Sequence, residues 1–265
     1  MNTGKYVFSQ ILELVNKYEF EKIVKKYNGN YRVRELNCWN QFIQLFFGQL
    51  TNLNSIRDIC LCLKAHNNKL YHLGIRNYVN HTTLSRANEK RDWQIFADFG
   101  YYLIELVRPL YKNSAVPNLS IENELFALDS TTISCSINLL IWAEGKYSRG
   151  AVKIHTLLDL RGSIPNFILI TDGKCHDSNI LDEITPEPEA IYIMDKAYVD
   201  FKALYRIHAF ESYFVTRAKS SLKYIIVEQN FNIDESTGLR ADKTIELTIA
   251  KSKKLYPEKL RLIEY

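Results

Sequence analysis

The stretch AIYIMDKAYVDF, residues 190–201, places an aspartate directly after an apolar run. The run Ala190–Met194 has the length and composition of a buried strand, and Asp195 follows it. The residues beyond predict a helix over Phe201–Phe210 and a further strand over Tyr213–Thr216. Because strands that alternate with helices usually pair in parallel, this part of the chain predicts the parallel half of a sheet.

Three earlier strands extend that sheet. They are expected over Leu125–Leu128, Val152–Leu160 and Ile164–Thr171, and RGS before the third has the composition of a hairpin turn. Because these strands lie close together in the sequence, we expect an antiparallel meander. The fold class is therefore α/β, with a mixed sheet covered by helices. Asp129 follows the first strand as Asp195 follows the fourth.

The N-terminal part has helical periodicity instead. Apolar residues recur at three- and four-residue spacing in Tyr6–Tyr27, and Asn37–Leu50 and His81–Trp93 are further helix candidates. The segment Asn113–Glu124, with its Pro and Asn residues, is the best linker candidate. We therefore expect a helical domain over residues 1–113, a mixed-sheet core over 114–218 and a strand-like, turn-rich segment over 219–265.

The basic charge is concentrated in the helical part. Up to Ser114 there are 16 Lys and Arg against 9 Asp and Glu, whereas the remainder has 18 against 21. This imbalance favours a domain that binds an anion such as DNA, joined to one that carries metal-binding carboxylates. Within the predicted helix His81–Trp93, the candidate DNA-binding residues are Arg86, Lys90 and Arg91. The alternative is a chance excess of charge on solvated helix faces.

The cysteines and the apolar runs exclude several classes of protein. The five cysteines are odd in number and lack the paired spacing of a zinc site, which argues against a disulfide framework and for a reducing compartment. The N-terminus lacks the uninterrupted apolar segment of a signal peptide, and no run approaches the ~18 apolar residues of a membrane span. We expect a cytoplasmic protein with no membrane partner.

The two aspartates at strand ends carry the predicted chemistry. Strand ends at the same edge of a sheet bring Asp129 and Asp195 close together. Two like charges a few ångströms apart repel unless a cation lies between them, and Mg²⁺ prefers carboxylate and phosphate oxygens. A phosphoryl-transfer site is the natural use of such a pair. The alternative is that both are ordinary aspartates at strand-to-turn junctions, where this residue is common.

Four motifs resemble those of a known family. They are FALDSTTI, KIHTLLDL, GKCHDSNIL and IYIMDKAYVDF, and the Asp-x-x-Tyr of Asp195 and Tyr198 is the most specific piece. Together they resemble the DDE transposases of bacterial insertion sequences, in the group with a β-rich insertion in a ribonuclease-H-like fold. The resemblance covers Leu125–Ala218 closely. The helical part is also similar to the domain that precedes the catalytic core in Bacteroides-type members.

The resemblance implies a function and a set of site residues. Asp129 and Asp195 take the first two catalytic and metal-ligand positions in a site for two divalent ions, Mg²⁺ or Mn²⁺. These ions activate water, and then the 3′-hydroxyl of the transposon end, for attack on phosphodiesters. The partners are DNA at the transposon ends and at the target, with a dimer expected on DNA. By the same resemblance, Lys196 and Tyr198 face DNA.

Several neighbours are candidates to assist. Lys153 and His155 alternate on the second strand, and we expect them to face the site with Asp129, where Lys holds a phosphate and His orients water or a leaving oxygen. The alternative is a solvated Lys and a satisfied strand His. His176, at the start of a short helix, is another possible assisting residue, and Arg149 is a candidate phosphate contact. Asp177 is interpreted mainly as the cap of that helix.

The third family position is not found. The family glutamate lies in Tyr-x-x-Arg-x-x-x-Glu-x-x-x-x-x-x-Lys; only Tyr31 with Arg34 begins this pattern, and position 38 is Cys. Glu228, Glu246 and Glu264 lack the motif. The interpretation is a C-terminally truncated transposase, ending within the β-rich insertion and inactive without its third carboxylate. Alternatives are a non-catalytic DNA-binding regulator, a ribonuclease-H-like nuclease that uses Asp172 or Asp177, and a decayed gene product.

Overall fold

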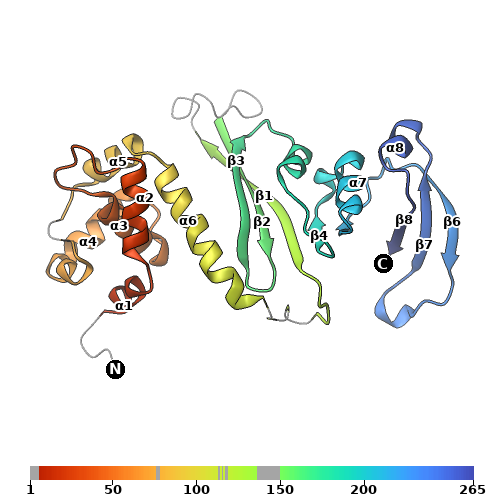
Figure 1. Ribbon diagram of the computed structural model, residues 1–265, viewed down its shortest axis with the longest axis horizontal. Helices are drawn as coiled ribbons and strands as arrows, with labels where there is room; N and C mark the ends of the chain where they lie inside the picture. Colours follow the sequence, from red (N-terminus) through yellow and green to blue (C-terminus); the bar gives the residue numbers. More distant parts are fainter. Residues whose placement is uncertain (1–5, 76–77, 113, 115, 117–118, 136–149) are drawn as a thin grey trace. The chain divides into compact units, whose positions relative to one another are not determined.

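The computed structural model describes residues 6–75, 78–112, 114, 116, 119–135 and 150–265. The chain forms two compact units, Met1–Val107 and Arg108–Tyr265 (Figure 1). The three-part division expected at residues 113 and 218 stays a prediction. Within the ranges given, no helix is long and apolar enough to cross a membrane.

The first unit is helical, as the sequence predicts. Its elements are α1 (Val7–Glu13), α2 (Lys17–Lys26), α3 (Cys38–Leu50), α4 (Ile56–Ala65), η1 (Asn67–Leu73), α5 (His81–Lys90) and α6 (Gln94–Val107). The single helix expected over Tyr6–Tyr27 is wrong, because the chain breaks between α1 and α2. Asn16 begins α2 by accepting a hydrogen bond from the Glu19 amide at 3.3 Å, a cap that is lost inside a continuous helix.

Aromatic side chains fill the centre of the helical unit. Phe20 of α2 contacts Trp39 and Phe42 of α3 and Phe99 of α6, with ring centroids 5.0–5.4 Å apart. Edge-to-face and tilted pairs of this kind add to the free energy gained by burying the rings. The apolar faces of α2, α3 and α6 therefore meet in one core.

The second unit contains two sheets. Its elements are η2 (Arg108–Tyr111), β1 (Leu125–Cys135), β2 (Gly150–Asp159), β3 (Ile164–Asp172), η4 (Asp177–Glu183), β4 (Ile191–Met194), η5 (Lys196–Tyr198), α7 (Phe201–Ala209), β5 (Tyr213–Thr216), β6 (Tyr224–Asn230), η6 (Glu235–Thr237), β7 (Ala241–Leu247), α8 (Ala250–Leu255) and β8 (Leu260–Glu264).

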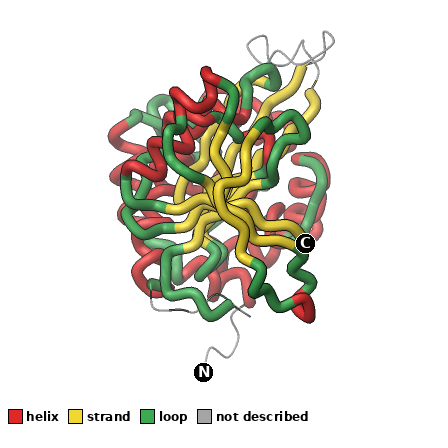
Figure 2. Tube along the Cα trace, turned by 90° about the vertical axis from the view of Figure 1, so that its right-hand side faces the viewer, coloured by secondary structure: helices red, strands yellow, loops and turns green. Residues whose placement is uncertain are grey.

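The larger sheet has the strand order β3-β2-β1-β4-β5, and the smaller one has the order β6-β7-β8. β1, β2 and β3 pair antiparallel, whereas β4 is parallel to both β1 and β5. The expected α/β fold, a helical part followed by a mixed-sheet core, is confirmed. In Figure 2 the strands fan out across one another, as the twist of β-sheets requires.

One face of the larger sheet is buried. Phe126 and Leu128 of β1 and Tyr192 and Met194 of β4 pack there with α7, η4 and η5. Leu247 and Tyr256, from the region of the smaller sheet, join the same core, and α7 lies between β4 and α8 in Figure 1. Side chains that alternate with these point to the other face, which is more exposed at Ile170 and Val215.

Candidate active site

Three neighbouring strands each place a charged residue at the same level of the larger sheet. The last parallel pairs are Leu128 with Met194, and Met194 with Thr216. The next residues along the chain are Asp129, Asp195 and Arg217. Because parallel strands lie about 4.8 Å apart, the register alone brings these three charges side by side at the carboxyl edge.

Asp129 lies inside its strand and not at the end of it. The sequence predicts that the first strand stops at Leu128, but β1 continues to Cys135 by pairing with β2. Only the pairing between β1 and β4 stops at Leu128. The site therefore forms where β1 leaves β4 and continues with β2 alone, which leaves the Asp129 side chain exposed.

The Asp195 carboxylate is paired with a cation. The Arg217 guanidinium donates to Asp195 Oδ1 through Nη2 at 2.6 Å and through Nε at 3.2 Å. This interaction, together with hydrogen bonding from the backbone of Lys196, holds the pKa of Asp195 below its ordinary value. Asp195 is therefore an anion at neutral pH, beside a position that already accommodates positive charge.

A polar network lies on the covered face of the sheet. Asp177 Oδ1 accepts hydrogen bonds from Ser130 Oγ at 2.9 Å and Lys153 Nζ at 3.2 Å, and His155 Nδ1 lies 3.6 Å away. His155 is fully buried, and burial lowers its pKa. On its other side, His155 Nε2 shares a hydrogen bond with Thr171 Oγ1 at 3.1 Å. Asp177 therefore ties η4 to β1 and β2, and the interpretation of Asp177 as a helix cap is wrong.

The expected position of Lys153 and His155 is also wrong. Lys153 lies opposite Thr132, and His155 opposite Ser130, whereas the partner of Asp129 is Thr156. Residues that face each other across a strand pair share a side of the sheet, and successive residues alternate. Lys153 and His155 thus lie on the Ser130 side and Asp129 lies on the other.

Tyr198 is part of the core. Its side chain is 1% exposed, so it has no surface with which to contact DNA, contrary to the expected role. Burial raises its pKa to about 12, and the charges of Asp177, Asp129 and Asp195 act in the same direction. The Ser130 hydroxyl lies close enough to lower that pKa slightly but donates to Asp177; among the described residues, the Tyr198 hydroxyl has no hydrogen-bond partner of good geometry.

The other candidate DNA-binding and assisting residues differ in accessibility. Arg86, Lys90, Lys196 and His176 are exposed, so their proposed contacts stay predictions. Arg91 is different, because its guanidinium donates to Gln41 and to the Leu36 carbonyl within the helical unit. Burial also lowers the pKa of Arg91. The expected DNA contact of Arg91 is therefore wrong, and its side chain instead connects segments of the helical unit. Arg149 lies outside the described residues.

Two aspartates fit the donor chemistry of a divalent metal. Mg²⁺ takes oxygen ligands and keeps several waters, so Asp129 and Asp195 suit it, and the Arg217 guanidinium shows that a cation is accommodated at this edge. Within the described ranges, no group of three or more His, Cys, Asp or Glu side chains is arranged to hold a metal.

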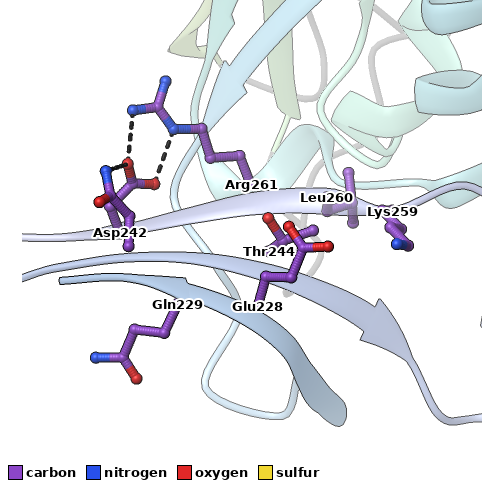
Figure 3. Close-up of a pocket in the computed structure, with 8 residues that line it drawn as sticks. Glu228, Gln229, Asp242, Thr244, Lys259, Leu260 and Arg261 are labelled. Carbon is purple, nitrogen blue, oxygen red and sulfur yellow. Dashed lines mark hydrogen bonds and ion pairs between the residues drawn. The ribbon is translucent and has the colours of Figure 1, made fainter. Parts of the chain in front are cut away.

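The later glutamates lie on the smaller sheet. Glu264 pairs with Lys243 at 2.6 Å and Glu246 with Lys253 at 3.1 Å. Glu228 lines a hollow of about 450 Å³, shown in Figure 3, in which Arg261 donates to both carboxylate oxygens of Asp242 at 2.9 and 3.0 Å. This hollow contains neither site aspartate, and its one arginine is already neutralised.

Two functional candidates were missed from the sequence. Arg217 follows the strand Tyr213–Thr216 as Asp195 follows Ile191–Met194, so the rule that identified the aspartates also identifies this arginine. Ser130 carries no such signal, because its role depends on the distant Asp177.

Comparison with known proteins connects both units to described families. Residues 121–261 match the family model described as "Transposase DDE domain", and residues 3–76 match one described as "Domain of unknown function (DUF4372)".

Curated proteins and solved structures that resemble the chain include transposases. The "Putative transposase y4zB" of Sinorhizobium fredii is 29% identical over 65% of this chain and 47% of its own length. The "Probable transposase for insertion sequence element IS5377" of Geobacillus stearothermophilus is 28% identical over 40% of this chain and 28% of its own length. The chain thus spans less than half the length of either. A piggyBac transposase synaptic complex with hairpin DNA aligns with 98% of this chain and 61% of its own at 10% identity, with a TM-score of 0.42.

Proposed function

Because this chain belongs to the transposase DDE domain family, we propose that it acts on DNA as an insertion-sequence transposase, with Asp129 and Asp195 as metal ligands. The observation that carries the proposal is the shared level of these two residues beyond the Leu128–Met194 pair. Transposon ends and target DNA are the proposed partners, with a dimer on DNA.

The residues present have distinct proposed roles. Asp129 and Asp195 would hold a divalent metal, which when bound would supply Lewis-acid stabilisation of charge at a phosphodiester. Arg217 neutralises Asp195, and its side chain is 76% exposed, so it is placed to contact a DNA phosphate. Lys196 is exposed next to Asp195 and contacts the DNA backbone. Tyr198 packs beneath them and fixes the turn that presents Asp195.

A second function is favoured by the ligand count. Since the described residues supply no group of three metal ligands, a chain that binds DNA without cutting it is the alternative. Such a protein occupies transposon ends and regulates a complete relative.

The test separates metal binding from cleavage. We expect Mn²⁺ binding, measured by electron paramagnetic resonance, to weaken at least about tenfold in Asp129→Asn and in Asp195→Asn, because each removes an anionic ligand. Glu183→Gln is the matched control, since it removes an exposed carboxylate elsewhere in the same unit. Unchanged Mn²⁺ binding in the double aspartate variant contradicts the metal site.

Nicking of supercoiled plasmid in Mn²⁺ or Mg²⁺ then distinguishes the two functions. Nicking that is lost in both aspartate variants supports the transposase. DNA binding with no metal-dependent nicking supports the regulator.

A further inference from the structure

A basic groove lies in the helical unit, between the α2–α3 connection and α5. Its volume is about 670 Å³; residues 27–36 form one wall, and α5 with the residues just after it forms the other. Five basic and two acidic side chains line it: Arg32, Arg34, Arg86, Lys90 and Arg91, with Glu35 and Asp92. The positive excess comes from two segments far apart in the sequence.

The wall formed by residues 27–36 is held firmly to the core. At Gly29 the backbone approaches the core so closely that an added Cβ would lie 2.5 Å from Ile95 Cδ1. Asn30 Oδ1 accepts a hydrogen bond from the Cys38 amide at 2.8 Å, and Leu36 is buried at the far end. The connection therefore has a fixed shape.

Arg91 joins the two walls. Its guanidinium donates to the Leu36 carbonyl and to the Gln41 side chain, and Gln41 donates to Asn88 of α5 at 2.5 Å. The Arg91 guanidinium thus makes its hydrogen bonds within the fold, and these bonds hold the two groove walls in place. A pre-arranged groove binds its ligand without first paying to order the walls.

Four cations in the groove have no carboxylate partner. Arg32, Arg34, Arg86 and Lys90 are exposed, and no described carboxylate lies within 4.0 Å of their charged nitrogens. Two lysines of α2 in the same unit contrast with them: Lys17 pairs with Glu21 at 3.6 Å and Lys22 with Glu19 at 2.9 Å. Lys25, Arg57 and Lys64 of the same unit are also exposed without a described carboxylate partner, so the groove differs in gathering four such cations along its two walls.

We propose that this groove holds the sugar-phosphate backbone of duplex DNA, an inference that rests on the proposed function. Arg32, Arg34, Arg86 and Lys90 contact phosphates, which position a protein on DNA without reading its sequence. Tyr31 is 70% exposed at the same rim, with the Arg32 guanidinium 5.1 Å from its ring centroid. That ring is placed to pack against a deoxyribose.

The test compares two double variants with the same change in charge. Arg86→Gln/Lys90→Gln removes two groove cations, and Lys17→Gln/Lys22→Gln removes two paired lysines of the same unit. Binding of the full chain to an end-labelled 30-bp duplex is measured by fluorescence anisotropy from 50 to 200 mM salt. Each phosphate contact contributes about 0.9 to the slope of log K against log salt, so the groove variant is expected to lose about 1.8 and to bind roughly 60-fold more weakly at 0.1 M salt. The control is expected to change by less than about twofold.

The outcomes separate the groove from the wider function. If both variants weaken DNA binding equally, or if neither does, the groove proposal is overturned and the proposed function stands. A wild-type chain that binds no duplex even at 50 mM salt overturns the proposed function together with the groove. Arg32→Gln/Arg34→Gln provides a second variant from the opposite wall, and it is expected to show the same loss with an unchanged melting temperature.

Discussion

Tyr198 and Tyr192 make a matched pair of buried tyrosines in one core. Tyr198 is 1% exposed and its hydroxyl has no hydrogen-bond partner among the described residues, whereas the Tyr192 hydroxyl accepts from the Glu187 amide at 2.8 Å. An unsatisfied buried polar group costs about 1–3 kcal/mol, and a satisfied one contributes about 1 kcal/mol. Replacement of each tyrosine by phenylalanine therefore has opposite expected effects.

For Tyr198→Phe we expect a free energy of unfolding that is unchanged or higher by up to about 1 kcal/mol, because the unpaired hydroxyl is removed with its desolvation cost. For Tyr192→Phe we expect a loss of about 1–2 kcal/mol, because the Glu187 amide is left without its acceptor. At about 2–4 °C per kcal/mol, the two melting temperatures are expected to differ by at least roughly 2 °C.

Thermal and urea unfolding, followed by circular dichroism, measure this difference. A Tyr198→Phe variant that is destabilised as much as Tyr192→Phe refutes the reasoning, because it means that the Tyr198 hydroxyl is hydrogen-bonded in solution. A bridging water to Ser130 is the arrangement that such a result indicates.

Two further predictions follow from the buried histidine and from the glycines. Burial lowers the pKa of His155 below its ordinary 6.5, so on acidification the unfolded chain takes up a proton before the folded chain does. The free energy of unfolding is then expected to fall as the pH drops through about 6.5, by up to about 1.4 kcal/mol per pH unit. Thermal melting from pH 7.5 to 5 is expected to show a shallower loss in His155→Asn than in the exposed control His176→Asn. Equal slopes in the two variants contradict the assignment. Gly29→Ala is expected to cost about 1–3 kcal/mol, because its Cβ meets Ile95 Cδ1 at 2.5 Å and Cys38 Sγ at 2.8 Å. Gly100→Ala in α6 is expected to stabilise the helix by about 0.5–1 kcal/mol, because beyond the chain neighbours and the backbone of the helix itself no described atom lies within 4 Å of the added Cβ. Urea titration that ranks the two variants the other way round excludes this account.

The sheet was largely predictable because each strand carries its own signal. The strands β2 to β5 begin and end within two residues of their expected positions, and the antiparallel and parallel halves follow from the spacing between strands. β1 was underestimated, because its second half, STTISC, is too polar to suggest a strand without its partner β2. The break at Asn16 was missed because apolar spacing continues through it.

Side-chain roles were harder to predict than strand positions. The sequence places Lys153, His155 and Asp129 on neighbouring strands, but only the register decides which face each one shares. Arg91 looks like its neighbours Arg86 and Lys90 until α3 brings Gln41 against it. Both errors concern contacts between segments far apart in the chain, which local patterns do not contain.

Because Asp129, Asp195 and Arg217 lie at a common level, the length of each paired strand determines where its charge lies in the site. Each charge stands one step beyond a paired run of four residues: Leu125–Leu128, Ile191–Met194 and Tyr213–Thr216. Adding a single residue to one run would advance its charge by about 3.3 Å and turn it to the opposite face. The length of the connections between these runs does not set the level of the charges, since the connections only return the chain to the starting edge. Homologous sequences are therefore expected to keep these three runs free of insertions and deletions while the connections vary in length, and new segments are best introduced into the connections.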